Sequence, residues 1–259
     1  MNSAKLKTTL SKKVQDAQTE PLEGNIAYMP NTSLAPSQPS HISLPPNALD
    51  IINENLKNKP LSIQSIDIIK SPTGGTTAFT VPSISGDEMQ KELVGVILDY
   101  SYPRAYWETP DPVEGTPPNC YSLDSIVSHD GKPCYQCMYN EFGTKGGDSE
   151  AKACKEYVLI YLLRQGNIMP IIVRVPVTSK VLFQKYLTRL VSNMIPICGV
   201  VTKITLEKTT NKAGQPYAKY IFEATDTLTD AEINGLKVYS QKIMSVLSAV
   251  NEQELGDVV

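Results

Sequence analysis

The chain has 259 residues, of which 41% are hydrophobic and 20% charged, and this composition is typical of a folded domain with a buried core. No run of about 18 apolar residues occurs, so we expect no membrane-spanning helix and no membrane partner. The net charge of -3 argues against a binder held to nucleic acid by its total charge alone, and two histidines are few for a catalytic metal site.

Basic residues are concentrated in the middle of the chain. Residues 116–220 hold 13 Lys/Arg against 7 Asp/Glu, whereas residues 61–115 hold 3 against 8 and residues 221–259 hold 2 against 7. Residues 1–60 are nearly balanced, with 6 against 5. A basic central block can attract phosphate locally whatever the total charge. The alternative interpretation is an ordinary scatter of surface charge.

Residues 1–58 are predicted to form a flexible arm. Residues 34–47 are rich in Pro, Ser and Asn, and such a composition buries too little apolar surface to offset the entropy of ordering. A short helix is predicted at 48–57, where aliphatic residues form a partial apolar face. That face could dock on the domain or on a neighbouring subunit.

Strands are predicted from residue 61 onwards. Residues 62–69 and 76–81 are rich in β-branched residues, and the Pro/Gly turn at 72–75 between them predicts a hairpin. A strongly apolar strand follows at 93–100 and runs into the densest aromatic cluster of the chain. This cluster contains Tyr102, Arg104, Tyr106 and the single tryptophan, Trp107. Its rings could stack unpaired bases beside Arg104, or they could fill the core of a barrel.

Four of the five cysteines lie between positions 120 and 154. Cys134 and Cys137 form a Cys-x-x-Cys pair on a turn, and Cys120 and Cys154 lie at the edges of two predicted strands. Four thiolates converging tetrahedrally on Zn²⁺ are the simplest use of this pattern. We therefore predict a structural zinc site formed by Cys120, Cys134, Cys137 and Cys154, which fastens a long loop within an insertion at 119–155.

Other uses of these cysteines stay open. His129 lies between the first two cysteines and could replace one ligand. A redox pair is disfavoured because no strand-then-helix pattern surrounds the motif. Disulfides are typical of secreted proteins. Two disulfides are therefore disfavoured, because residues 1–18 are polar and lysine-rich, unlike a secretory signal. The same observation leads us to expect a cytoplasmic protein.

The rest of the chain alternates strands with two amphipathic helices. Strands are predicted at 155–164, 169–177, 197–208 and 216–224, and helices at 181–193 and 229–250. Cys198 is flanked by apolar residues and is predicted to be a core thiol. Residues 251–259 carry three acidic residues and are predicted to form a loose tail.

Together these elements predict a mainly β fold with a few helices. Short turns favour an antiparallel sheet, and the element order matches an OB-like Greek-key barrel with a helix between late strands and a C-terminal helix. The barrel strands would lie near 94–102, 121–128, 156–164, 169–177, 197–208 and 217–224. The predicted barrel domain spans 59–228 and carries the zinc insertion, followed by the C-terminal helix and the tail.

A series of short motifs supports a resemblance over roughly residues 62–225. The motifs lie at 71–75, 95–98, 104–107, 118–120, Cys134-x-x-Cys137, Asn140-x-Phe142-Gly143, 153–155, Pro176-x-Thr178-Ser179 and 201–206. They resemble a family of uncharacterised bacteriophage and mobile-element proteins with a four-cysteine segment. The plan is also similar to zinc-containing OB-fold single-stranded-DNA-binding proteins. That similarity implies phage-type DNA replication or recombination, with proteins of those processes as further partners and the host cytoplasm as the location. The C-terminal end lacks the concentrated acidic run and terminal Phe usual in such binders.

The leading hypothesis is a non-catalytic single-stranded-DNA-binding protein with a basic groove and aromatic stacking. The residues expected to contact DNA are Tyr102, Arg104, Tyr106, Trp107, Tyr139, Phe142, Lys145, Lys152, Lys155, Lys203 and Lys219. The alternative is a zinc-stabilised structural or protein-interaction adaptor that uses the N-terminal arm and the C-terminal helix. A third interpretation is a magnesium-dependent enzyme, but its candidate acids are scattered and no Walker-type or His-x-Glu motif occurs. The oligomeric state is left open.

Overall fold

The computed structural model describes residues 42, 44–57, 59, 61–109, 112–113, 116–147, 150–211 and 214–247. The chain divides into two units, Met1–Gln38 and Pro39–Val259, and every described residue belongs to the second. Most of the expected arm, residues 1–41, and the expected tail, residues 251–259, therefore lie outside the described residues. Among the helices of the described part, none is long and apolar enough to cross a membrane.

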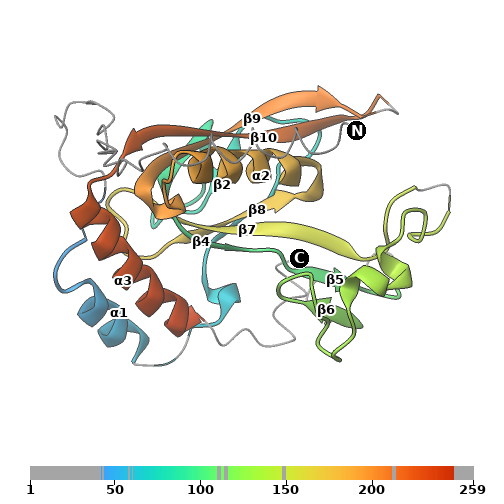
Figure 1. The fold of residues 1–259 in the computed structure, drawn as a ribbon, viewed down its shortest axis with the longest axis horizontal. Helices are drawn as coiled ribbons and strands as arrows, with labels where there is room; N and C mark the ends of the chain where they lie inside the picture. The colour runs from blue at the N-terminus through green and yellow to red at the C-terminus, as the bar shows by residue number, and fades with distance from the viewer. Residues whose placement is uncertain are drawn as a thin grey trace, which may run out of the picture. The chain divides into compact units, whose positions relative to one another are not determined.

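The fold is mainly β and is built on one curled eight-stranded sheet that forms a half-barrel (Figure 1). Its main strand order is β1-β8-β7-β4-β9-β10, and β5 pairs with both β7 and β6 at one end. The strands are β1 (Ile68–Ile69), β4 (Glu92–Ser101), β5 (Arg104–Tyr106), β6 (Cys120–Ser122), β7 (Lys155–Leu163), β8 (Ile171–Pro176), β9 (Val200–Thr210) and β10 (Pro216–Thr227). All pairings are antiparallel except β1 with β8. A separate two-stranded sheet joins β2 (Phe79–Val81) to β3 (Glu88–Gln90).

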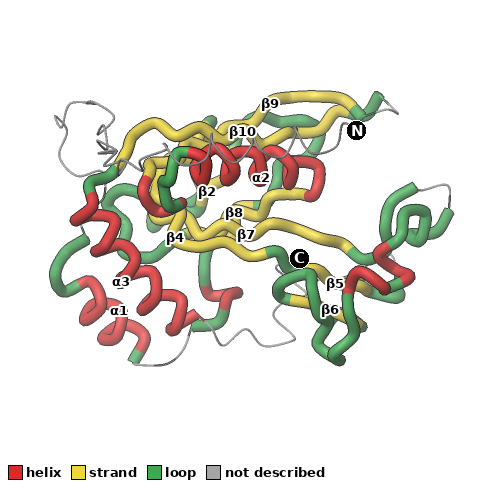
Figure 2. The backbone as a smooth tube through the Cα atoms, in the orientation of Figure 1, coloured by secondary structure: helices red, strands yellow, loops and turns green. Residues whose placement is uncertain are grey.

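Helices cover both faces of the large sheet (Figure 2). They are α1 (Ala48–Leu56), α2 (Val177–Ser192) and α3 (Asp230–Leu247), with short 3₁₀ turns η1 (Ile63–Ser65), η2 (Cys134–Gln136), η3 (Met138–Asn140) and η4 (Ile197–Gly199). The helix α2 packs in one core, and α1 and α3 pack in a second core on the opposite face. Because side chains alternate along a strand, each buried strand can supply both cores.

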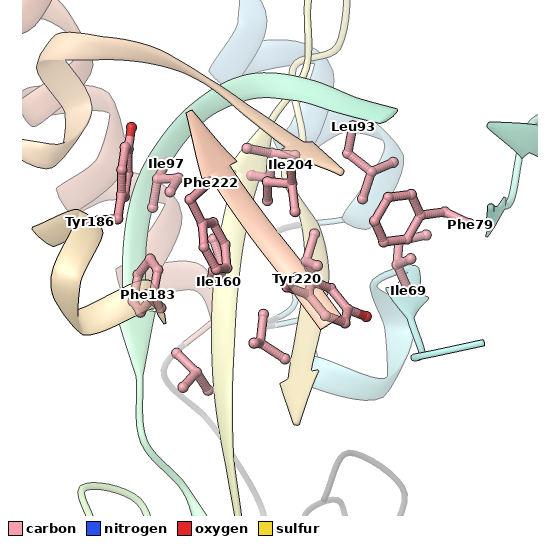
Figure 3. Close-up of a cluster of buried hydrophobic side chains, with 14 of the residues drawn as sticks. Ile69, Phe79, Leu93, Ile97, Ile160, Phe183, Tyr186, Ile204, Tyr220 and Phe222 are labelled. Carbon is pink, nitrogen blue, oxygen red and sulfur yellow. The ribbon is translucent and has the colours of Figure 1, made fainter. Parts of the chain in front are cut away.

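Aromatic and aliphatic side chains pack together in the core beneath α2 (Figure 3). Phe183 and Tyr186 of α2 lie against Phe222 of β10, with ring centroids 5.2 and 6.0 Å apart. Tyr220, two residues earlier on the same strand, meets Phe79 edge-on at 5.7 Å. This contact brings the small β2–β3 sheet into the same core.

A glycine allows the central strands to approach closely. A Cβ at Gly95 of β4 would lie 2.4 Å from the backbone carbonyl oxygen of Leu163 on β7. Any larger residue would push these two strands apart.

Most of the longer predicted elements are confirmed. The helix at 181–193 is α2, that at 229–250 is α3, and the short helix at 48–57 is α1, whose Ala48 and Ile52 are buried. The strands at 93–100, 155–164, 169–177, 197–208 and 216–224 correspond to β4, β7, β8, β9 and β10. Cys198 is buried, as a core thiol should be.

Two local predictions are wrong, one because of a long-range strand pairing and one because of a local turn. The segments 62–69 and 76–81 do not form a hairpin, since β1 pairs in parallel with β8 and β2 pairs with β3. The predicted strand at 121–128 is reduced to β6, because Asp124 caps a turn by accepting backbone N–H bonds from Ile126 and Val127 at 2.8 and 3.2 Å. In the described part of the chain, β1 and β10 end the strand order and share no ladder.

Candidate metal centre

Two of the four clustered cysteines flank the same residue of β5. Cys120 opens β6 and is the register partner of Tyr106. On the other side, Ala105 pairs with Lys155, so Cys154, the residue before β7, is level with Tyr106. Residues paired across neighbouring strands point to one face, and the strands are about 4.8 Å apart. Cys120 and Cys154 are thus placed on one face of β6-β5-β7.

The Cys134–Cys137 turn is tied to this scaffold through backbone hydrogen bonds. Cys134 starts the 3₁₀ turn η2, which closes when the Cys137 N–H donates to the Cys134 carbonyl at 3.3 Å. The Cys154 N–H then donates to the carbonyl of Tyr139 in η3 at 2.9 Å. In addition, the Asn140 side-chain amide donates to the Cys134 carbonyl at 3.1 Å. These bonds bring the turn beside the start of β7.

The four thiols interact electrostatically. Burial raises the pKa of Cys154 to about 11; the Arg104 guanidinium opposes this shift, and Cys137, Cys120 and Cys134 add to it. Burial also raises the pKa of Cys120, with further contributions from Asp130, Cys137 and Cys134, and Lys132 opposes the shift. None of the five cysteines of the chain is in a disulfide. Binding of a divalent cation would favour the deprotonated form of Cys120 and Cys154, against the effect of burial.

A second donor set shares Cys120. Ligand atoms of Cys120, His129 and Asp130 lie within 4.8 Å of one another and could hold a metal ion, whereas no three of the four clustered cysteines, all of them described, have their sulfur atoms that close together. The His129 ring stacks on Tyr121, with centroids 4.6 Å apart. Hydrogen bonds from Lys132 and then Ser128 hold the pKa of the Asp130 carboxyl well below its usual range. The sequence pointed to His129 as a replacement ligand, but Asp130 was missed, although it adjoins His129 in a Gly-containing turn.

Two of the predicted DNA-contact residues are buried. The Arg104 guanidinium forms an ion pair with the Glu156 carboxylate, with Nη2 and Oε2 3.2 Å apart, and donates to the Ser125 hydroxyl at 2.9 Å. The Trp107 side chain is 6% exposed, and its indole N–H donates to the Thr116 carbonyl at 2.9 Å. The Arg104 side chain is therefore engaged inside the fold, and Trp107 offers little surface for a base.

Three tyrosines of the predicted set pack against other side chains. Tyr106 and Tyr139 stack on each other, with centroids 3.8 Å apart and ring planes 13° from parallel. Tyr102 is half-buried, meets Tyr100 edge-on at 5.6 Å and has the Lys180 amine 5.3 Å from its ring centroid. The Tyr106–Tyr139 stack joins β5 to the Cys-containing turn.

Five of the six remaining predicted contacts fall into two groups. Phe142 is 78% exposed and has the Lys152 amine 4.7 Å from its ring centroid, and Lys145 is exposed on the same insertion. Lys203 forms an ion pair with Glu223 at 2.7 Å, and Lys219 is half-buried on β10. This second pair lies on β9 and β10, a different part of the sheet from the insertion (Figure 1).

Four of the predicted residues meet in one small cleft of about 70 Å³. Tyr106 and Trp107 come from β5 and the residue after it, Lys145 from the insertion, and Lys155 from the start of β7. The Lys155 amine lies 5.5 Å from the Trp107 ring centroid. The sequence did not predict a role for Tyr135 and Met138, whose side chains are 72% and 67% exposed on the same insertion. Their only signal was proximity to the Cys-x-x-Cys pair.

Comparison of the chain with protein-family models, with curated proteins and with solved structures finds no match.

Proposed function

We propose that this chain is a non-catalytic single-stranded-DNA-binding protein whose DNA strand enters the cleft between β5 and the Cys-rich insertion (residues 119–155). The observation that supports this proposal most is the convergence of Tyr106, Trp107, Lys145 and Lys155 from three separate stretches of sequence. The two lysines can contact phosphates, and the rings of Tyr106 and Trp107 form the wall of the cleft rather than a platform for a base.

The two amines of the cleft are suited to phosphate contacts. The Lys145 backbone N–H donates to the Ala151 carbonyl at 3.1 Å, which closes the loop on which this lysine stands. The Thr144 hydroxyl donates to the Glu141 carbonyl at 2.7 Å and accepts from the Ala153 N–H at 3.0 Å. The loop is thereby joined to the segment that leads into Lys155. Because the backbone that carries both lysines is held in place, less entropy is lost when a phosphate binds than on a mobile loop.

Phe142 provides a platform for a base. Its ring is mostly exposed, and the Lys152 amine lies near it at 4.7 Å. Lys152 in turn donates to the Asn140 side-chain carbonyl at 3.2 Å, which restrains the amine. Stacking of one base on an aromatic side chain contributes about 1–3 kcal/mol.

The metal proposed for this protein is a structural Zn²⁺ held by Cys120, Cys134, Cys137 and Cys154. Thiolates are the ligands that suit Zn²⁺ in closed structural sites, and hydrogen bonds tie the Cys134–Cys137 turn to the residue before β7, Cys154. The set with His129 and Asp130 is the alternative. When bound, the ion would fasten the insertion to β5, β6 and β7. We further propose that the curled sheet acts as an OB-like platform and that replication or recombination proteins are partners.

One observation favours the adaptor function instead. Tyr135, Met138 and Phe142 are all more than half exposed on the insertion, and such an apolar group is also typical of a protein-binding surface. The adaptor would bind a protein through these side chains and would leave DNA unbound.

The test is a titration of the intrinsic fluorescence of Trp107, the single tryptophan of the chain. Addition of oligo-dT should change the emission saturably, duplex DNA should bind more weakly, and salt should weaken both. Fluorescence anisotropy of labelled oligo-dT measures binding independently of Trp107. Lys145→Ala should lower the affinity, whereas Lys242→Ala on the exposed side of α3 is the matched control. Absence of binding by both methods at micromolar protein would refute the proposal and favour the adaptor.

A further inference from the structure

A second pair of an aromatic ring and a cation lies directly beside the cleft. Tyr157 of β7 packs against the small core formed by Ala105 and Trp107. The Arg174 guanidinium of β8 lies over the Tyr157 ring, with Cζ 4.8 Å from the ring centroid. The Lys155 amine lies over the Trp107 ring at 5.5 Å. Two cation–aromatic pairs therefore adjoin through Trp107.

Register places these residues on one face of the sheet. Lys155, Tyr157 and Leu159 alternate along β7 and so project from the same face. Leu159 is the register partner of Arg174 on β8, and paired residues point the same way. Lys155, Tyr157 and Arg174 thus form a continuous surface from the cleft onto β8.

The next strand adds another cation. β1 runs parallel to β8, with Ile69 paired to Val173. Lys70, the residue after β1, is consequently level with Arg174, and it is exposed. Two two-residue steps along β7 and two strand spacings separate Lys155 from Lys70, which is about 16 Å in a straight line.

The helices leave this end of the face uncovered among the described residues. The core that contains α1 and α3 includes Leu159, Tyr161 and Leu163, which lie farther along β7 from the insertion. Toward the insertion, Tyr157 and Lys155 are only half-buried. Figure 1 shows α1 and α3 at one end of the sheet and β5 and β6 at the other.

The charges on this face favour one path for a DNA strand over the other. The exposed Asp99 of β4 pairs with Tyr161 and so lies on the same face, where its carboxylate repels a phosphate. On the other side of β7, Arg174 and Lys70 attract one.

We infer that a DNA strand held in the cleft continues across Tyr157 and Arg174 to Lys70, so that the binding surface spans β5, β7, β8 and the end of β1. This inference rests on the proposed function, because it extends the same strand. The phosphates meet Lys155, Arg174 and Lys70 in turn, and the backbone is directed away from Asp99.

The test compares a short and a long oligo-dT, of about 4 and about 16 nucleotides, the range of site sizes in comparable folds. Arg174→Gln should weaken binding of the long oligonucleotide about tenfold, since a charge-assisted contact is worth about 1.5–3 kcal/mol. Lys70→Ala should weaken it in the same direction. Each variant should reduce the salt slope by about 0.7, the value for one phosphate of a single strand. Binding of the short oligonucleotide in the cleft should be unchanged.

The outcomes separate the inference from the proposed function. If the unmodified protein binds neither oligonucleotide, both are refuted. If it binds the long one and the two variants bind it as well as Lys242→Ala does, only the inference is overturned. Equal weakening of short and long oligonucleotides would also overturn it, because the residues would then act on the cleft itself. Thermal melting of each variant checks the fold, and the exposed Lys70 provides a test that does not disturb the Tyr157 packing.

Discussion

Replacement of Glu156 by Gln is expected to destabilise the folded protein by about 3 kcal/mol. The Glu156 carboxylate lies between two cations: it forms an ion pair with Arg104 at 3.2 Å and a second one with Lys180. The side chains of Arg104 and Glu156 are 9% and 15% exposed. Removing one partner of a buried pair costs about 3–5 kcal/mol because the other charge stays desolvated. The 24% exposure of Lys180 places the loss at the lower end.

The measurement is urea unfolding followed by the fluorescence of Trp107, which is buried one residue beyond β5. Thermal melting should show a decrease of about 6–12 °C, since 1 kcal/mol corresponds to about 2–4 °C in a domain of this size. Glu223→Gln is the matched control, because it breaks the Lys203–Glu223 pair, in which Glu223 is 60% exposed, and should change stability little. A loss for Glu156→Gln no larger than that of the control would refute the reasoning.

Three further predictions concern the metal, the pH dependence and the glycines. Cys134→Ser should lose the proposed Zn²⁺ in a metal analysis, and its Cys-rich insertion should become more sensitive to proteases. Cys198→Ser changes a buried cysteine outside the cluster and should keep one ion per chain in the same analysis. The metal-free protein should lose stability as pH rises from about 9 to about 11, because burial raises the pKa of Cys154 above its ordinary value and the folded state then holds a proton that the unfolded state has released. In urea titrations across that range, Cys154→Ser should show a smaller loss than the unmodified protein. Gly95→Ala should destabilise by about 1–3 kcal/mol, since its Cβ would meet a backbone oxygen of β7 at 2.4 Å. Gly235→Ala should stabilise the folded protein by about 0.4–1 kcal/mol, because alanine lowers the entropy of the unfolded chain and its Cβ would meet no neighbouring atom within 4 Å in α3. Equal effects of the two glycine substitutions on stability would contradict this packing.

Local patterns predicted the elements that local physics controls. The spacing of Phe183, Tyr186 and Leu190 marks α2, because a repeat of three to four residues places these side chains on one helical face. The Gly166–Asn167 turn joins β7 to β8 as expected, since Gly166 has a φ of 80° that suits a tight reversal. The pairing of β1 with β8 could not be seen this way, because the partners are about 100 residues apart and compete with a nearer hairpin.

The roles of single side chains were harder to predict than the elements. Arg104 sits among aromatics in the sequence and was expected to contact DNA, but a carboxylate on β7 engages it inside the fold. Tyr157 and Arg174 gave no sequence signal, since they are far apart in the chain and meet only because β7 pairs with β8.

The sequence by itself determined the mainly β character, the helices at 48–57, 181–193 and 229–250, and the concentration of four cysteines in one insertion. Each of these follows from composition or from short-range periodicity. Tertiary structure alone decided which cations are held in ion pairs, which rings are buried, and which residues line the cleft. Those properties depend on strand register and on the approach of distant segments, and a shift of one residue in register would turn Lys155, Tyr157 and Arg174 to the other face.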